Sequence, residues 1–356
     1  MSTYTEFWNL KEVILWNVQN YNLKKIDITF RLAYGENFKY APFFKDITDI
    51  EVFKKDIIER TEDIDNFKKI LLDYWIKVIE PEVLNEFKTF KTPNFSWVLT
   101  PVSNPRDRVL IYWKKIIETP AMTRKRYFEN QLLYNVFLEY FNAWYTWISA
   151  PYPLLDMWRF DEEYWQNKRD FDNFDASRYD ISFDAANIIK IWKDLLFNVA
   201  TYNHELWARW LQNLLWETVN IHKIYQLDDS HIDGKISVLR PWIFLINWKT
   251  WDKIRDYLPH KFKNWECIFV TEDEKCNLNQ DGMSLCSFHW ACTNVLSINE
   301  NTVCVLDEAK NTIKKLEERG FTVIPVQFRH CEIFWWWLHC ATLDVNREDD
   351  FIDYTQ

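Results

Sequence analysis

Glycine is scarce in this sequence, which has 4 glycines and 21 tryptophans in 356 residues. An average globular chain of this length has about 25 glycines, because glycine makes up roughly 7% of ordinary composition. Several tryptophans stand where a turn is expected, including Trp113, Trp242 and Trp248. Since glycine is the residue that normally occupies positive φ angles, we expect the indoles to be excluded from such angles and to disturb these turns.

Other absences narrow the class of protein. No apolar run approaches the ~18 residues of a membrane-spanning helix, and residues 1–20 lack the basic-then-apolar pattern of a secretory leader. No cluster of Lys and Arg accompanies the net charge of -10, so neither nucleic acid nor an anionic membrane is expected as a partner. Seven cysteines, none before Cys267, predict reduced thiols in a cytoplasmic protein.

One structural module recurs along the chain. Residues 295–306 read as a β-hairpin with an Asn-rich turn. A helix that begins at Asp307 and is stopped by Gly320 follows, and residues 321–328 form a further strand. The order of elements is therefore strand, strand, helix, strand.

Four more copies of this module precede it. They have hairpins at 109–117, 188–199 and 236–246, helices at 123–143, 203–215 and 250–258, strands at 146–149, 218–224 and 267–270, and an N-terminal copy built from 12–15, 64–74 and 76–79. Modules this small cannot each bury a core, so we expect them to share one within a single domain, residues 1–356, closed around a central cavity. Two adjacent α/β domains are the alternative. The aperiodic segments 87–102 and 151–179 are predicted to be rim loops.

Polar residues recur immediately before the first strand of successive modules. Asp107 precedes one hairpin, Asp184 the next, and His231 with Asp233 the one after. Equivalent positions in a ring of modules face the same axis, so these side chains are predicted to converge, with Cys340 joining them from the segment that closes the ring. Taken singly, each residue has a simpler explanation as a turn residue, a surface histidine or a small core cysteine.

This set of residues points to covalent chemistry on a cationic substrate. A cysteine thiolate attacks an electrophilic carbon, and a nearby histidine moves a proton. Three aspartates in one cavity repel one another unless the ligand is a cation with planar N–H donors. A guanidinium group meets that requirement, because its forked N–H groups bind carboxylates in bidentate fashion.

The chain resembles the amidinotransferase family, which includes arginine:glycine and arginine:inosamine-phosphate amidinotransferases. The similarity is carried by Leu10–Leu15, Lys91–Phe95, Pro105–Asp107, Ile116–Pro120, Phe183–Asn187, Glu205–Leu206 with Ala208–Gln212, His231–Asp233 and Leu338–Val345. The resemblance implies an α/β fold of five ββαβ modules, the pentein-type propeller, with pseudo-fivefold symmetry around a central active site.

The resemblance also implies roles for individual residues. Cys340 would attack the guanidinium carbon of arginine and release ornithine, and His231 would protonate the departing amine and later deprotonate the acceptor amine. Asp184 would orient His231 or the guanidinium, and the substrate-binding residues would be Asp107, Asp233 and Ser287. The family arginine that holds the donor carboxylate has no clear counterpart, although Lys249 and Thr250 fall nearby. No metal or organic cofactor is expected, the only expected partners are small-molecule substrates, and the oligomeric state stays open, a homodimer included.

Tryptophan replaces the glycines of the family at several positions, above all at Trp335, Trp336 and Trp337 before the nucleophile. We expect these indoles to fill the donor site or displace Cys340 and so to weaken or abolish turnover. A guanidine hydrolase similar to arginine deiminase and an inactive arginine-binding relative are the alternatives on the same scaffold. A zinc protein using the spacing of Cys286, His289 and Cys292, together with His330–Cys331 and His339–Cys340, is a third.

Overall fold

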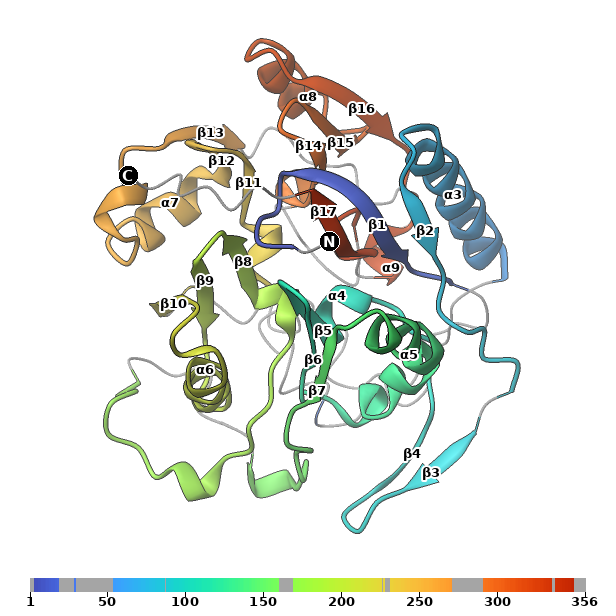
Figure 1. The fold of residues 1–356 in the computed structure, drawn as a ribbon, viewed down its shortest axis with the longest axis vertical. Coiled ribbons are helices and arrows are strands. Elements are labelled where there is room, and N and C mark those ends of the chain that lie inside the picture. The colour runs from blue at the N-terminus through green and yellow to red at the C-terminus, as the bar shows by residue number, and fades with distance from the viewer. Residues whose placement is uncertain are drawn as a thin grey trace.

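The structure is a computed structural model that describes residues 3–18, 29, 54–86, 88–159, 169–225, 227, 231–270, 291–334 and 337–348. In this part of the chain the strands form five three-stranded sheets and one separate hairpin. Figure 1 shows the five sheets set around a common centre, with the helices α3, α5, α6, α7 and α8 toward the periphery. The predicted α/β propeller of five ββαβ modules is therefore confirmed.

The module at residues 296–326 shows the common pattern. Strands β14 (Leu296–Asn299) and β15 (Thr302–Leu306) form an antiparallel hairpin, and β16 (Thr322–Val326) lies parallel to β15. Helix α8 (Lys310–Glu317) makes the crossover between these parallel strands, as such a connection requires. Its N-cap is Ala309 rather than the predicted Asp307, while Gly320 does end the segment in a left-handed conformation.

Three further modules repeat this order, and their predicted strands are confirmed. They are β5 (Val109–Tyr112), β6 (Lys115–Glu118), α5 (Tyr134–Asn142) and β7 (Thr146–Ser149); β8 (Ile188–Ile191), β9 (Asp194–Val199), α6 (Tyr202–Leu215) and β10 (Asn220–Tyr225); and β11 (Ile236–Arg240), β12 (Ile243–Asn247), α7 (Trp248–Ile254) and β13 (Glu266–Val270). The helix predicted at 123–143 was wrong in its first half, where two 3-10 helices, η2 (Arg124–Arg126) and η3 (Glu129–Leu133), precede α5.

The fifth module is assembled from both ends of the chain. Strand β1 (Asn9–Leu15) pairs parallel to β2 (Lys77–Ile79) and antiparallel to β17 (Thr342–Glu348), and α3 (Lys54–Asp73) makes the crossover. The second strand of this hairpin thus comes from the segment that follows Cys340. This pairing closes the ring and holds Cys340 beside the first module.

The modules bury their apolar faces against one another rather than in one common core. Four hydrophobic clusters are present in the described residues, and each draws side chains from neighbouring modules. The largest combines Leu15 of β1, Phe67 of α3, Leu245 of β12 and Val305 of β15. Burying each such side chain contributes about 1.5–3 kcal/mol, so every module depends on its neighbours for stability.

The two segments predicted as rim loops behave differently. Residues 87–102 include a hairpin of β3 (Thr89–Lys91) and β4 (Ser96–Val98), so that prediction was wrong in part. Within 151–179 the described residues form two 3-10 turns, η4 (Met157–Arg159) and η6 (Ala176–Arg178), and otherwise irregular structure. In the described part of the chain, no helix has the length and apolar character needed to cross a membrane.

Tryptophan occupies left-handed turn positions, contrary to our expectation. The seven non-glycine residues with positive φ among those described include Trp75, Trp113, Trp144, Trp192 and Trp242, with φ between 52° and 69°. Trp248 is instead the first residue of α7. Turns therefore form at Trp113 and Trp242, as predicted, but not at Trp248, and each positive-φ tryptophan is in a conformation that costs roughly 1–2 kcal/mol.

Candidate active site

Three short helical turns bring the predicted polar residues to the centre. Helix α4 (Pro105–Arg108) leads into β5, η7 (Ala185–Asn187) into β8, and η8 (Ile232–Gly234) into β11. Pro105 suits the first position of such a turn, because its missing N–H would have no helical partner there. Each turn ends where the buried first strand of its module begins, so the polar residues lie at equivalent places in three modules.

His231 lies between two carboxylates. Its Nδ1 is 3.5 Å from Oδ1 of Asp107, and its Nε2 is 3.3 Å from Oδ2 of Asp184. Burial alone would lower the pKa of His231, but the charges of Asp107 and Asp184 outweigh burial and raise this pKa to about 9. Burial alone would raise the pKa of Asp184. The hydrogen bond with His231 and the charge of Arg126 outweigh burial and lower this pKa to about 2. The imidazole is therefore a cation at neutral pH and can give up a proton.

Asp107 is also held by Arg126. The Arg126 Nη1 donates to Oδ2 of Asp107 at 2.6 Å, and Glu129 accepts from the same guanidinium at 2.6 and 2.9 Å. Burial raises the pKa of Asp107, against the opposing charges of His231 and Arg126. The ligand atoms of Asp107, Asp184 and His231 lie within 4.8 Å of one another, so these three residues could also hold a metal ion.

Cys340 is buried beside Asp233 and Asn294. The thiol donates to Oδ2 of Asp233 at 3.4 Å and accepts from Nδ2 of Asn294 at 3.1 Å. Burial, followed by the charges of Asp233 and Asp107, raises the pKa of Cys340 well above its usual value. Hydrogen bonds from Asn294 and the backbone of Trp337 act in the opposite direction. The resting thiol is therefore protonated, and an incoming cation would favour the thiolate.

The two halves of the centre act on each other electrostatically. The Asp107 carboxylate contributes to the pKa shifts of both His231 and Cys340, and Asp233 also contributes to both. Both aspartates are 1% exposed. Among the described residues, Oδ1 of Asp233 accepts no hydrogen bond, and Oδ1 of Asp107 has only the 3.5 Å ion-pair contact with Nδ1 of His231. A buried carboxylate oxygen without a donor is costly, so both oxygens are suited to an N–H-rich ligand.

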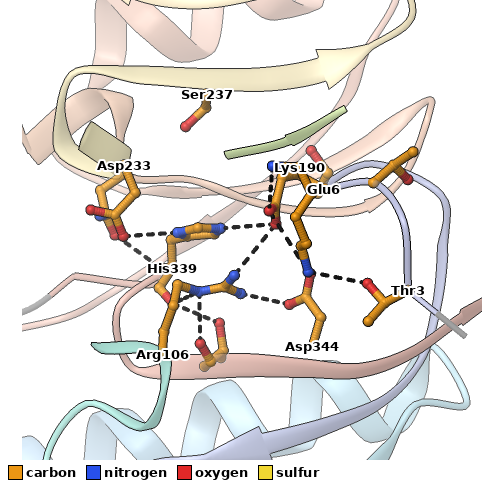
Figure 2. A network of polar contacts seen from close by, with 12 residues as sticks. Thr3, Glu6, Arg106, Lys190, Asp233, Ser237, His339 and Asp344 are labelled. Carbon is orange, nitrogen blue, oxygen red and sulfur yellow. Dashed lines mark hydrogen bonds and ion pairs between the residues drawn. The ribbon is translucent and has the colours of Figure 1, made fainter. Parts of the chain in front are cut away.

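A buried ionic network includes His339, the residue next to Cys340 in the sequence (Figure 2). His339 contacts Oδ2 of Asp233 through Nδ1 at 2.9 Å and Oε2 of Glu6 through Nε2 at 3.5 Å. Arg106 donates to the His339 carbonyl at 2.9 Å and to Asp344 at 2.6 Å. Arg106 of α4 belongs to the module of β5, whereas Glu6 precedes β1 and Asp344 lies in β17 of the closing module, so the network ties the segment that carries Cys340 to the neighbouring module.

Several residues of this centre were missed from the sequence. Glu6 belongs to no repeated motif, and the signal for His339 is its position next to Cys340. Asn294 lies between η10 (Ala291–Thr293) and β14, just before the first strand of its module as Asp107 and Asp184 are in theirs, so the repeat could have identified it. The five residues predicted to converge, Cys340, His231, Asp184, Asp107 and Asp233, do so through the contacts described above. Ser287 lies outside the described residues. Thr250 is buried, and the side chain of Lys249 is outside the described part.

The indole of Trp337 does not displace the nucleophile. Trp337 is buried in the largest hydrophobic cluster, together with Leu338 and Ala341, while Cys340 keeps its contact with Asp233. Trp335 and Trp336 lie outside the described residues, as do Cys286 and His289 of the zinc alternative. The five described cysteines are free thiols. A second group with metal-binding geometry consists of Asp56, Glu59 and His330; it contains His330 of the zinc alternative but no cysteine.

Comparisons with known proteins identify close relatives. No protein-family model matches the chain. The chain is 32% identical over 253 residues to inosamine-phosphate amidinotransferase 1 of Streptomyces glaucescens. The aligned region covers 70% of this chain and 69% of that protein. It is 29% identical over 301 residues to the L-arginine:L-lysine amidinotransferase of Pseudomonas savastanoi pv. phaseolicola, covering 82% and 80% of the two chains.

Solved structures give the same result. The inosamine-phosphate amidinotransferase of Streptomyces griseus superposes with a TM-score of 0.85 at 27% identity, over 100% of this chain and 99% of that one. A dimethylarginine dimethylaminohydrolase superposes over 94% of this chain with a TM-score of 0.60 at 12% identity, which shows a shared pentein fold alone.

Proposed function

The chain belongs to the amidinotransferase family, and on that premise we propose that it transfers the amidino group of L-arginine to an acceptor amine through an amidino-cysteine intermediate on Cys340. The observation that carries this proposal is that the Cys340 thiol lies beside Asp233 and the His231 imidazolium lies between Asp107 and Asp184, with these histidine and aspartate residues just before the first strands of successive modules. We further propose that residues 1–356 act as one domain, because its first sheet needs strands from both ends of the chain.

Binding of the guanidinium prepares the nucleophile. Asp107 and Asp233 accept N–H bonds from arginine through their Oδ1 atoms. The cation offsets the negative charges that keep the thiol protonated, so the Cys340 pKa falls when arginine binds. Oδ2 of Asp233, 3.4 Å from the sulfur, is the first acceptor of the thiol proton.

Proton transfer by His231 then drives both half-reactions. The thiolate attacks the guanidinium carbon, and His231, protonated and held by Asp184, gives its proton to the departing amine so that ornithine leaves. The acceptor amine next attacks the amidino carbon, His231 takes the proton that this amine loses, and Cys340 leaves as the thiolate. The substrate-binding role of Ser287 stays a prediction.

The acceptor belongs to a restricted chemical class in this proposal. The names of the two relatives state lysine and inosamine phosphate as substrates, and each compound carries an anionic group as well as an amine. We propose an acceptor of the same kind for this chain.

The test measures product formation from arginine with and without an amine. We expect ornithine in stoichiometric amount from arginine alone and sustained ornithine release when an acceptor such as L-lysine is added. The Cys340→Ser variant should release none. Citrulline formed from arginine alone would identify the hydrolase alternative, and arginine binding without any product would identify the inactive relative.

A further inference from the structure

A small pocket of the second module contains a buried arginine. Its lining includes Arg108 of α4, Glu118 of β6, Asn130 of η3, Ser149 of β7 and Tyr152, which is exposed. The cavity volume of about 30 Å³ exceeds the ~10–15 Å³ that one water molecule requires and suits a group the size of a carboxylate.

The Arg108 guanidinium has few partners for a buried cation. Arg108 is 3% exposed, and its Nη1 donates to Oγ1 of Thr119 at 3.1 Å. Among the described residues Arg108 forms no ion pair, and its Nε makes no hydrogen bond. A guanidinium has five N–H donors, so most of its hydrogen-bonding capacity is unused there. Burying a charge in this way is costly unless a ligand supplies the counter-charge.

The acid nearest to Arg108 within the pocket is already engaged. Glu118 accepts from Nε1 of Trp147 at 2.8 Å, from Oγ of Ser149 at 2.6 Å and from Nδ2 of Asn130 at 3.0 Å. Burial, followed by repulsion from Arg126, lowers the pKa of Arg108. Arg126 directs its own donors to Asp107 and Glu129. The charge of Glu118 favours the charged form of Arg108, but among the described residues the two form no ion pair, so the pocket offers a ligand the N–H donors of Arg108 rather than an excess of positive charge.

Arg108 is connected to the catalytic centre by chain and by contact. It directly follows Asp107 in α4, and the Thr119 hydroxyl that accepts from Arg108 donates to the Asp107 carbonyl at 3.0 Å. The charge of Asp184 also influences the pKa of Arg108. A substrate held at Arg108 would therefore lie next to the centre that contains His231 and Asp184.

We infer that the pocket at Arg108 binds the carboxylate of the acceptor, which makes the acceptor an amino acid. This inference rests on the proposed function. The planar fork of a guanidinium matches the two oxygens of a carboxylate, whereas a point charge would give no such geometric selection. The Thr119 hydroxyl fixes the fork so that Nε and the remaining nitrogen can bind the ligand.

The experiment compares acids with matched amines in the full-length Cys340→Ser protein, in which binding is measured without turnover. The probes are L-lysine against 1,5-diaminopentane, glycine against methylamine, and phosphoethanolamine against ethanolamine, with calorimetric Kd as the readout. We expect at least one amino acid to bind about 10- to 100-fold more tightly than its amine partner. Arg108→Gln should remove this preference, Arg108→Lys should restore part of it, and exposed Arg178→Gln is the matched control that should keep it.

Four results would overturn the inference: no acid bound more tightly than its amine, a preference that persists in Arg108→Gln, a preference confined to the phosphate pair, or Arg108 dependence found only for arginine over agmatine. The last would assign the pocket to the donor. Arg108→Gln and Arg108→Lys are both checked for an unchanged unfolding transition, so that a folding defect is not read as lost binding. Failure of the proposed function is read separately, as the absence of an arginine-dependent adduct on Cys340 in the unaltered protein.

Discussion

His231 is kept positively charged by its two aspartate neighbours, Asp107 and Asp184. Its pKa in the folded protein is about 9, above the 6.5 of an unfolded histidine. A raised pKa stabilises the folded state fully below pH 6.5, and this stabilisation disappears as the pH rises through 9. The shift corresponds to roughly 3 kcal/mol as an upper figure.

We therefore predict that the unfolding free energy of the unaltered protein falls relative to that of His231→Gln between pH 6.5 and pH 9.5. Urea unfolding of both proteins at the two pH values measures the difference. Lys125, whose pKa burial lowers to about 7, titrates in both proteins and cancels in the comparison. Equal pH slopes for the two proteins would refute the assignment.

Asn294 is predicted to set the reactivity of Cys340. Its amide donates to the sulfur and its Oδ1 accepts from the backbone amides of His339 and Cys340, at 2.9 and 3.3 Å. Asn294→Ala removes a hydrogen bond that favours the thiolate, so Cys340 should react with iodoacetamide about tenfold more slowly at pH 8. Peptide mapping by mass spectrometry measures the rate, with buried Cys304 as the internal control. An unchanged Cys340 rate would rule out this role.

The left-handed turns are strained, because tryptophan occupies positions with positive φ. Trp144 connects α5 to β7 with φ 67° and is 87% exposed, so its side chain contributes little burial. Trp144→Gly should raise the unfolding free energy by about 1 kcal/mol, because glycine adopts this conformation without a steric penalty. Denaturant unfolding measures the change.

Trp216 is the matched control for that substitution. It is also exposed, at 69%, but it caps α6 with right-handed φ and ψ of -46° and -39°. Trp216→Gly should lower stability by about 1 kcal/mol, because glycine is a poor residue in helical conformation. Similar destabilisation by both substitutions would show that positive φ is not the source of strain.

Local elements were predictable from the sequence, and distant pairings were not. The hairpin of β14 and β15 follows from two apolar runs around an Asn-rich turn, which is a local signal. The pairing of β1 with β17 joins residues more than three hundred positions apart, and neither strand carries a signal for the other. The helix predicted from residue 123 failed because periodic apolar residues do not distinguish a 3-10 turn from the start of an α-helix.

The residues of the candidate site also include some that could be predicted from the sequence and others that could not. Asp107, Asp184, His231 and Asp233 could be predicted because the repeat gave them equivalent positions. Asn294 shortly precedes β14 in the same way and could have been predicted on that ground. Glu6 was missed because it is a single polar residue whose role depends on a contact between distant segments of the chain.

At the scale of the whole molecule, the buried ionic network holds the ring together. Arg106 joins Glu6 near the N-terminus to Asp344 of the closing strand, with all three side chains nearly inaccessible to solvent. Arg106→Met leaves both acids buried without that partner and should cost about 3–5 kcal/mol. The exposed pair Lys11–Glu348 is the control, and Lys11→Met should change stability by less than about 1 kcal/mol. Comparable losses in the two variants would show that the network does not stabilise the ring.

The most direct test of the central claim is intact-protein mass spectrometry after incubation with arginine alone. The account predicts a gain of one amidino group, located on Cys340 by peptide mapping and absent from the Cys340→Ser variant. The Trp335→Gly/Trp336→Gly variant should form the adduct faster, because it removes two of the indoles that replace family glycines just before Cys340 in the sequence. An adduct on a different cysteine, or none in either protein, would contradict the account.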